Sequence, residues 1–469
     1  MSRRPIYMRS NKGSYVLLVM FLAVVVWLVY GYDKSFPLQS LVENSELKGK
    51  NFQGNVIELR APKSGIVFYY MKETTNPLVS MAFLFDKSGT SYVEDNKEGL
   101  AGLVASTIKD GAGRLSAETL RDMLAVKGIK IGFMADKDVF SGQISMPKNV
   151  LSEAAYYLKD ILQTPHFSQA YVQSAKAQIM KSLETEKENI SKELSLEFIK
   201  NLYLNHPYGR NPLGRLETLA SLSRDDLKRF VKAYLVKDNL FIGLVGDLSE
   251  DDAKKFVDDI FEGLPQKSKI KELDDVVIDW DKPVLEIKRD NGQNIVAYAS
   301  EGTCRKCDDF YPLYIANYLF GGSGINSKLN QQIREKEGLT YGGYSVLSVN
   351  DKSDLILAGF SATADKIVLA KQLFDDVWFG IANEGFSEEE LKSAKNYLTA
   401  SYNLRFASIV GIAEMLAYMQ KYQLGLDFLQ KRNGYIENVS LKQLNAVAKK
   451  YFGSKRLQAE IGTFKKGEK

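Results

Sequence analysis

The sequence predicts an α+β protein of two homologous domains, each a mostly antiparallel sheet covered by helices, preceded by one N-terminal transmembrane helix. Three observations support this prediction: an uncharged run near the N-terminus, an internal repeat, and strand-like segments followed by helical ones in each half. The chain has 469 residues, too many for one ordinary core. With 45% apolar and 26% charged residues, its composition is that of a globular protein.

The N-terminus predicts a membrane anchor. Residues 1–14 carry four basic side chains and no acid, and residues 15–32 carry no charge. Such a run is near the lower length limit for a helix that spans a bilayer. A cleaved signal peptide is the alternative, but its apolar region is normally shorter, and residues 29–31 (Val-Tyr-Gly) suit cleavage poorly. Because basic flanks stay in the cytoplasm, we expect a bacterial inner-membrane anchor with the domains in the periplasm.

An internal repeat divides the rest of the chain into two halves. Residues 167–176 and 386–395 both begin with Phe-Ser and end with Ser-Ala-Lys. Residues 223–234 and 440–451 share Ser, Leu, Lys and Tyr positions, with nearly the same separation. Two such pairs in the same order indicate duplication. The serine before each helical pattern suits a helix N-cap.

Within each half, strand-like patterns come before helical ones. The expected strands of the first half lie in residues 64–73, 78–89 and 130–146 and in the segment 239–249, which leads into an N-capped helix, and its long helices lie in 150–162 and 170–204. The expected strands of the second half lie in residues 294–300, 342–350 and 355–363. The predicted organisation is a basic tail (1–14), the anchor (15–32), a linker (33–52), a first domain (53–265), a charged linker (266–284) and a second domain (285–465).

Charge and cysteine content narrow the function. The net charge of +4 is small for this length and no basic stripe with interleaved aromatics is present, which argues against nucleic-acid binding. The two cysteines, Cys304 and Cys307, are too few for the common four-cysteine zinc cluster. In an oxidising compartment we expect them to form a small disulfide that staples a loop. A redox centre is the alternative, although it would need a βαβ context.

Four segments carry a resemblance to a known family: residues 99–120, 206–214, 244–265 and 320–345. Through them the chain resembles the pitrilysin-type, or insulinase-like, zinc peptidases, which include the mitochondrial processing peptidase subunits. The match covers about residues 53–465. The resemblance implies two family domains in one chain and, often, closure of four such domains around a peptide.

The resemblance also shows what this chain has lost. Active members carry H-x-x-E-H on a helix of the first half, where two histidines bind zinc and the glutamate activates water. Here Gly102, Ala105 and Ser106 occupy the three reactive positions. We therefore expect no catalytic residue and no metal site in this chain.

Other candidate ligands do not replace the motif. The two histidines, His166 and His206, are forty residues apart, so no pair lies four residues apart on a helix. His206, in the segment HPYG, is expected to cap or pack. Glu184 and Glu186 lie roughly where the family places its third ligand, but a lone carboxylate holds zinc poorly.

The second half retains residues that the resemblance assigns to substrate binding. Arg334 and Tyr341 match an arginine and a tyrosine that face the zinc of a partner domain. A guanidinium binds a peptide carbonyl through paired donors, and a phenol stabilises a developing oxyanion. The alternative is an exposed arginine near a helix end and an ordinary strand aromatic. Gly321, Gly322 and Gly324 form either a substrate-side loop or a helix C-cap.

The leading interpretation is a non-catalytic, substrate-binding subunit of a membrane-anchored, extracytoplasmic zinc metallopeptidase. A partner with intact H-x-x-E-H would hold the zinc, and an extended peptide or unfolded protein would be the substrate. The main alternative is a non-proteolytic scaffold that keeps the peptidase fold as an assembly surface. A redox protein built on the cysteine pair is a third interpretation.

Overall fold

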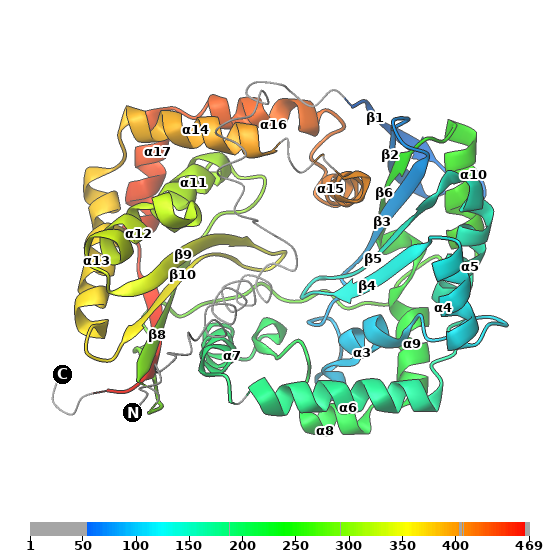
Figure 1. Cartoon of the computed structure of the whole chain (residues 1–469), viewed down its shortest axis with the longest axis horizontal. Helices are drawn as coiled ribbons and strands as arrows, with labels where there is room; N and C mark the ends of the chain where they lie inside the picture. The colour runs from blue at the N-terminus through cyan, green and yellow to red at the C-terminus, as the bar shows by residue number, and fades with distance from the viewer. Residues whose placement is uncertain (1–53, 187, 291, 403–405, 407, 465–469) are drawn as a thin grey trace, which may run out of the picture. The chain divides into compact units, whose positions relative to one another are not determined.

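Two β-sheets and the helices around them make up the computed structural model, which describes residues 54–464 apart from 187, 291, 403–405 and 407 (Figure 1). The strands are β1 (Val56–Arg60), β2 (Val67–Lys72), β3 (Leu78–Asp86), β4 (Lys130–Ala135), β5 (Val139–Pro147), β6 (Leu240–Gly246), β7 (Leu285–Lys288), β8 (Gln293–Glu301), β9 (Thr340–Val349), β10 (Asp354–Thr363) and β11 (Arg456–Gly462). The helices of the first half are α3 (Leu100–Thr107), α4 (Ala117–Val126), α5 (Leu151–Gln163), α6 (Gln169–Glu186), α7 (Ile190–Leu202), α8 (Leu216–Ser221), α9 (Arg224–Tyr234) and α10 (Glu250–Phe261). Those of the second half are α11 (Phe310–Asn317), α12 (Lys328–Asn330), α13 (Ile367–Glu384), α14 (Glu388–Tyr402), α15 (Ile409–Lys421), α16 (Phe428–Glu437) and α17 (Leu441–Val447).

The two sheets share one strand order. The first is β1-β2-β6-β3-β5-β4 and the second is β7-β11-β8-β10-β9. In each sheet one pair of neighbours is parallel, β2 with β6 and β7 with β11. The remaining neighbours are antiparallel. The second sheet therefore repeats the first strand by strand, without a counterpart of β1. Both sheets are mostly antiparallel, as expected.

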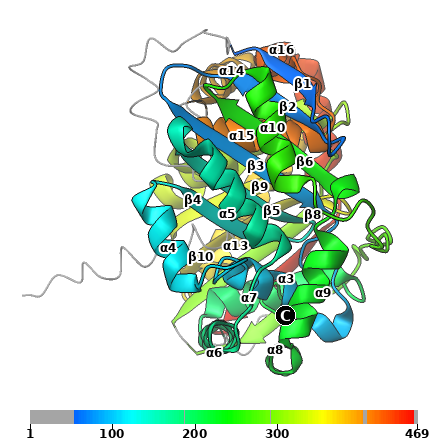
Figure 2. The same ribbon diagram turned by 90° about the vertical axis from the view of Figure 1, so that its right-hand side faces the viewer.

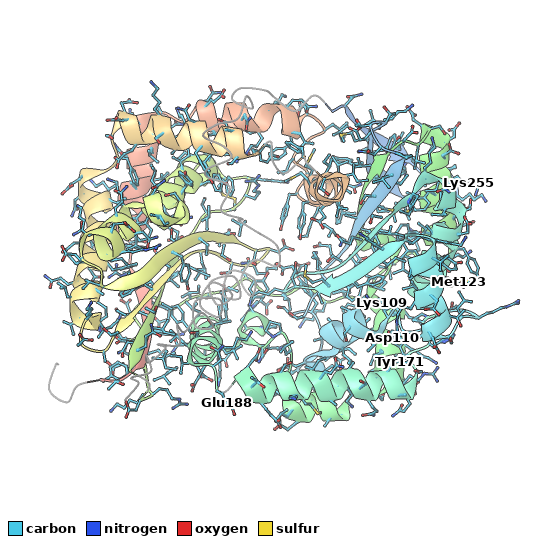
Figure 3. The ribbon with its side chains drawn as sticks, viewed as in Figure 1. Lys109, Asp110, Met123, Tyr171, Glu188 and Lys255 are labelled. Atoms are coloured by element: carbon cyan, nitrogen blue, oxygen red, sulfur yellow. A yellow bond between two sulfur atoms is a disulfide. The ribbon has the colours of Figure 1, made fainter. Side chains whose placement is uncertain are left out.

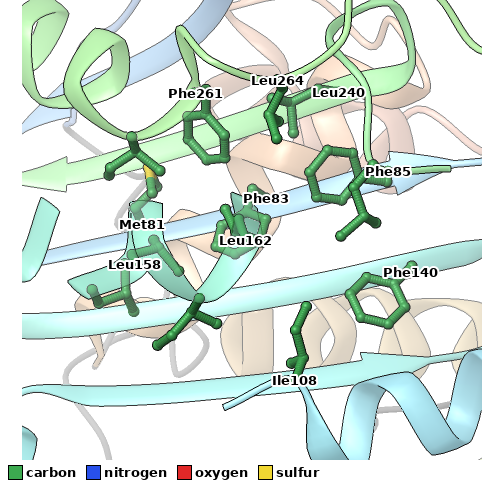
Figure 4. Close-up of a cluster of buried hydrophobic side chains, with 14 of the residues drawn as sticks. Met81, Phe83, Phe85, Ile108, Phe140, Leu158, Leu162, Leu240, Phe261 and Leu264 are labelled. Atoms are coloured by element: carbon green, nitrogen blue, oxygen red, sulfur yellow. The ribbon is translucent and has the colours of Figure 1, made fainter. Parts of the chain in front are cut away.

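Strand β3 shows why a strand of the first sheet has a nearly continuous apolar sequence. Met81, Phe83 and Phe85 point into one core, while Ala82 and Leu84 alternate with them and point into another. Figure 4 shows the first of these cores, where side chains of α5 and α10 cover the sheet. Figure 2 shows α5 and α10 side by side on this face. A strand buried on both faces has no need of polar alternation.

Each half contributes a helix to the sheet of the other half. Helix α15, from the second half, packs against β6, β3 and β2 on the face away from α5 and α10 (Figure 1). Helix α7, from the first half, packs against β11 and β8. In addition, Gln420 of α15 accepts a hydrogen bond from the Ile242 nitrogen at 2.7 Å and donates to the Val67 oxygen at 2.6 Å. Contacts of this kind hold the described residues of both halves in one compact unit.

One helix prediction is wrong. Residues 170–204 form two helices, α6 and α7, instead of one. The side chain of Asn189 accepts hydrogen bonds from the nitrogens of Ser191 and Lys192 at 3.1 and 3.2 Å, and so caps a new helix. An asparagine at an N-cap competes with helix continuation, and here it redirects the chain toward the second sheet.

The serine caps of the second repeated pair are confirmed. Ser223 accepts a hydrogen bond from the Asp226 nitrogen, while the Asp226 carboxylate accepts from the Ser223 nitrogen. Ser440 and Gln443 form the same reciprocal capping box at the start of α17. The two copies of the repeat thus begin their helices by the same local chemistry.

The predicted anchor, residues 15–32, lies outside the described residues. Within the part of the chain that the structure describes, no helix is both long enough and apolar enough to cross a bilayer. The predicted domain boundaries stay a prediction.

Candidate functional site

Helix α3 keeps the family frame without its reactive groups. Leu103 and Val104 are buried in the core of the first sheet. Among the three motif positions, Gly102 is half-buried, Ala105 is buried and Ser106 is exposed. The Ser106 hydroxyl donates a hydrogen bond to the Leu103 oxygen at 2.9 Å, so its polar atom is used within the helix. The helix therefore presents no nitrogen or carboxylate ligand at these positions.

Glu186, one of the acids expected near the third-ligand position, is already paired. A Cβ on Gly102 would lie 3.7 Å from the oxygen of Pro212. The neighbouring Asn211 donates to one oxygen of Glu186 at 3.3 Å. The other oxygen of Glu186 lies 3.0 Å from the ammonium of Lys192. Burial lowers the pKa of Lys192, and the Glu186 carboxylate opposes this shift. An ammonium group thus supplies the positive charge beside Glu186.

The residues present do not fit a zinc ion. Zinc in proteins takes four ligands from Cys, His and carboxylate groups, and a catalytic site keeps three of them on the protein. Glu184 is exposed, and Glu186 is engaged as described above. Among the described residues, no three His, Cys, Asp or Glu side chains are grouped closely enough to hold a metal. Figure 3 shows Lys109 and Asp110 directly after α3, and Glu188 beyond the end of α6.

The histidines have structural partners. Nδ1 of His206 accepts a hydrogen bond from the Tyr208 nitrogen at 3.2 Å, which confirms the expected capping role. Its Nε2 lies 3.0 Å from the Asp274 oxygen, which can only accept, so Nε2 carries the proton. Nε2 of His166 lies 2.8 Å from the Gly113 oxygen. Both imidazoles hold loops in place.

Arg334 and Tyr341 lie at the two ends of one short connection. Arg334 belongs to a π-helical turn, Gln331–Lys336, and Tyr341 is the second residue of β9. Between them Gly338, with φ 57°, donates a hydrogen bond to the Arg334 oxygen at 3.0 Å. The Arg334 side chain is 39% exposed, and its Nε lies 3.4 Å from the Glu335 carboxylate. A guanidinium with this exposure is accessible to a ligand. Isolated π-helical turns are frequent at functional sites.

A β-bulge interrupts β9 at Tyr341. Gly343 faces Phe360 of β10, whereas Thr340 faces Ala362. Two residues of β9 therefore stand opposite one residue of β10. Bulges bend a strand and re-aim a side chain, and they are over-represented next to active sites. The backbone of Tyr341 thus lies within the bulge, outside the regular ladder.

The glycine run packs beside β9. Gly321 and Gly322 end a second π-helical turn, Tyr318–Gly322, that continues α11. A Cβ on Gly321 would lie 2.8 Å from the Ser345 nitrogen of β9, so only glycine permits this approach. Gly324 has φ 62°, and nothing lies within 4 Å of where its Cβ would be. The first two glycines therefore end this helical segment beside β9, and Gly324 begins a 3₁₀ turn, Gly324–Asn326, that leads to α12.

Sequence reasoning missed a buried polar cluster where the two halves meet. The Lys421 ammonium, on a side chain only 5% exposed, lies 2.7 Å from both oxygens of Asp351 and 3.0 Å from Asp86. The Asp351 nitrogen donates to Asp138 at 3.1 Å, and the Tyr208 hydroxyl donates to the other oxygen of Asp138. Burial, followed by the Asp351 charge, raises the pKa of Asp138 to about 7. The only sequence motif that pointed to this cluster was HPYG, which contains Tyr208.

Cys304 and Cys307 form a disulfide in the connection between β8 and α11. The guanidinium of Arg305, between them, lies 4.1 Å from the ring centre of Phe310, the first residue of α11. The disulfide thus closes a short loop whose arginine packs on the start of the next helix.

Comparison with known proteins relates the chain to one family. Residues 221–398 match a family model described as the peptidase M16 inactive domain. A Helicobacter pylori protein named non-peptidase homolog YmxG is 25% identical over 402 residues, which cover 84% of this chain and 91% of that protein. The crystal structure of a peptidase M16 inactive domain from Pseudomonas fluorescens has a TM-score of 0.81 at 23% identity, covering 88% of this chain and 99% of that one. The periplasmic protease PqqL from Escherichia coli has a TM-score of 0.76 at 13% identity, covering 89% of this chain and 46% of that one.

Proposed function

Because this chain is a member of the peptidase M16, or pitrilysin-type, family that lacks the catalytic motif, we propose that it is the substrate-binding subunit of a zinc metallopeptidase. A partner of the same family with intact H-x-x-E-H would contribute the zinc and the water-activating glutamate. This chain would contribute Arg334, Tyr341 and the glycine loop Gly321–Gly324 to the shared site. The substrate would be an extended peptide or an unfolded protein segment.

The observation that carries the proposal is the contrast between the two halves. In the first half the motif helix has no ligand, and Glu186 is neutralised by Lys192. In the second half an accessible guanidinium, a bulge and two π-helical turns surround the Arg334–Tyr341 connection. Such irregular backbone is costly and common at binding sites. A protein that used only the outer surface of the fold for assembly would not need this irregular backbone.

Arg334 and Tyr341 would have different roles. The Arg334 guanidinium would hold a backbone carbonyl of the bound peptide before and during reaction. The Tyr341 hydroxyl would donate to the oxygen of the scissile carbonyl as negative charge develops there. The two roles predict different kinetic effects. Loss of a contact made only in the transition state lowers kcat without weakening substrate binding, whereas loss of a contact made throughout weakens binding as well.

The test is reconstitution with a member of the family that carries H-x-x-E-H, using an internally quenched peptide as substrate. Tyr341→Phe should lower kcat by about 10²- to 10³-fold, because one oxyanion donor is lost. Arg334→Ala should raise KM as well. Tyr344→Phe, three residues further along β9, is the matched control and should leave both constants unchanged.

Zinc content and assembly complete the test. All variants should co-purify with the partner, and elemental analysis should find zinc in the complex but no stoichiometric zinc in this chain alone. Wild-type kinetics for Tyr341→Phe and Arg334→Ala in an intact complex would contradict the proposal.

A scaffold without proteolysis is the second candidate. It is favoured by the printed name of the Helicobacter pylori relative, which describes that protein as a non-peptidase homolog. The two candidates differ in one measurement: a scaffold would bind its partner yet leave the partner's peptide hydrolysis unchanged when it is added or removed.

We also propose that residues 15–32 anchor the protein with its bulk outside the cytoplasm. The basic flank and the uncharged run support this, and the structural neighbour PqqL is named a periplasmic protease. Protease added to intact spheroplasts should degrade the described part of the chain, whereas a cytoplasmic control protein should survive. Protection of the chain under these conditions would contradict the proposed topology.

A further inference from the structure

Asn330, at the end of α12, links two segments of the candidate site through its side-chain amide. The residue is 3% exposed. Its Nδ2 donates to the Gly324 oxygen at 2.8 Å and to the Gly343 oxygen at 2.7 Å. Its Oδ1 accepts from the Gly343 nitrogen at 2.6 Å. One amide thus contacts both the glycine loop and the bulged start of β9.

The amide takes the place of a neighbouring strand. β9 is the edge strand of the second sheet, so no strand among the described residues pairs with its outer backbone groups. Asn330 accepts from the nitrogen of Gly343 and donates to its oxygen, as a residue of an adjacent strand would. Further along, Asn317 donates to the Ser345 oxygen at 3.5 Å. Side-chain amides therefore cover this edge, and the glycine loop is docked on it.

The bulge next to Gly343 makes this arrangement sensitive to Asn330. A bulge disrupts the ladder locally, and a slip of one residue turns a side chain to the opposite face of the sheet. Without the amide, the nitrogen and oxygen of Gly343 would be left without their present partners. Regular pairing with β10 through Tyr341 would then become a competing arrangement.

We propose that Asn330 is a positioning residue of the substrate-binding site, whose amide fixes the glycine loop and the bulge at Tyr341 in one arrangement. The inference rests on the proposed function, because it concerns how Tyr341 is held for its role. Asn330 itself does not touch substrate.

The test uses the reconstituted complex and the same quenched peptide. Asn330→Leu keeps a similar volume and removes all these hydrogen bonds. It should lower kcat roughly 10- to 100-fold, the cost of a misplaced reacting group. The double variant Asn330→Leu/Tyr341→Phe should be no slower than Tyr341→Phe alone, because residues that act through one another are not additive.

Asn294 is the matched control in the same sheet. It is 0% exposed, and its amide donates to Glu460 at 2.8 Å and accepts from the Thr463 nitrogen at 3.0 Å. Asn294→Leu loses a comparable set of hydrogen bonds on β8, which β10 separates from the bulge in β9. If Asn294→Leu lowers kcat at all, the loss in the double variant Asn294→Leu/Tyr341→Phe should equal the product of the two single losses, as expected for a purely structural change.

Hydrogen exchange of full-length chains provides a readout besides activity. The Gly343 amide should exchange at least tenfold faster in Asn330→Leu, while amides of β8 keep their rates, since the bond that protects it is gone. If Asn330→Leu does not fold, Asn330→Asp retains the acceptor oxygen but turns a carboxylate oxygen toward two backbone carbonyls, and it should show the same non-additivity.

The outcomes separate the two proposals. A normal kcat for Asn330→Leu, or a loss that multiplies with that of Tyr341→Phe, overturns the positioning role and leaves the proposed function intact. An unaffected Tyr341→Phe enzyme overturns the proposed function, and the positioning role with it. Loss of activity in both single variants without further loss in the double variant supports both.

Discussion

Asp138 is a residue whose protonation changes on folding. It lies in the turn between β4 and β5, beside two other acids, Asp136 and Asp351, and it accepts a hydrogen bond from the Tyr208 hydroxyl. The Lys421 ammonium pairs with Asp351 and Asp86 instead. Burial first, and the Asp351 charge second, raise the pKa of Asp138 from 3.8 to about 7. The fold therefore favours the protonated form of this carboxyl.

This gives a pH dependence of stability with a definite sign. Because the folded-state pKa lies above the unfolded one, the stabilisation is complete below about pH 4 and is lost as pH rises through about 7. Asp138→Asn should flatten the change in unfolding free energy over this window, where each tenfold difference in proton affinity corresponds to about 1.4 kcal/mol. Urea denaturation at a series of pH values measures it.

The control for this prediction is Asp309→Asn. The hydrogen bond from the Lys450 ammonium holds the pKa of Asp309 below its usual range. Its contribution is therefore present at neutral pH and lost on acidification, the opposite sign. Asp309→Asn should keep the wild-type slope between pH 5 and 7, and an unchanged slope in Asp138→Asn as well would contradict the assignment.

At the scale of the element, α15 decides how the first sheet is covered. The helix comes so close to β6 that a Cβ on Gly243 would clash with the Ala413 oxygen and lie 2.6 Å from the Ala417 nitrogen. Leu416 is fully buried at the same contact. This close approach of the two backbones constrains the position of α15 on the sheet.

Gly243→Ala should therefore destabilise the protein by about 1–3 kcal/mol, because the added methyl group must displace backbone. Gly380→Ala, in α13, is the matched control, since nothing lies within 4 Å of its added Cβ. In a helix interior that change should be neutral or stabilise by up to about 1 kcal/mol. Chemical denaturation of both variants tests the prediction, and equal stability for Gly243→Ala and the wild type would contradict it.

At the scale of the whole described unit, the halves depend on one another because α15 covers the first sheet and α7 packs on the second. We call this arrangement the exchange of α7 and α15. Each sheet packs against a helix from the other half. The linker, residues 266–284, adds ion pairs between Glu272 and both Lys87 and Lys352. Separating the halves would expose the apolar face of the first sheet that α15 covers.

A cut in the linker should therefore leave the halves associated. With a specific protease site inserted after Lys269, which is exposed, both fragments should elute together in gel filtration after cleavage. By contrast, residues 53–265 expressed alone should bind a hydrophobic dye and lack a cooperative unfolding transition. A stable, cooperatively folding first half would show that the exchanged helix is not needed.

The sequence by itself determined the features that depend on neighbours a few residues apart. Capping boxes at Ser223 and Ser440, the strand patterns and the loss of the zinc motif at Gly102, Ala105 and Ser106 can all be read locally. The repeat also indicated that the second half follows the plan of the first, and the strand order bears this out.

Only the tertiary structure decided the rest of the candidate site. Asp138 meets Asp351 across 213 residues, and no local pattern predicts that they lie together. The bulge at Tyr341 is defined by the pairing of β9 with β10. The amide of Asn330 bonds to the backbone of β9 because β9 is the edge strand of its sheet. Periodicity shows which face of an element is apolar but not which partner covers it, so the exchange of α7 and α15 followed from packing alone.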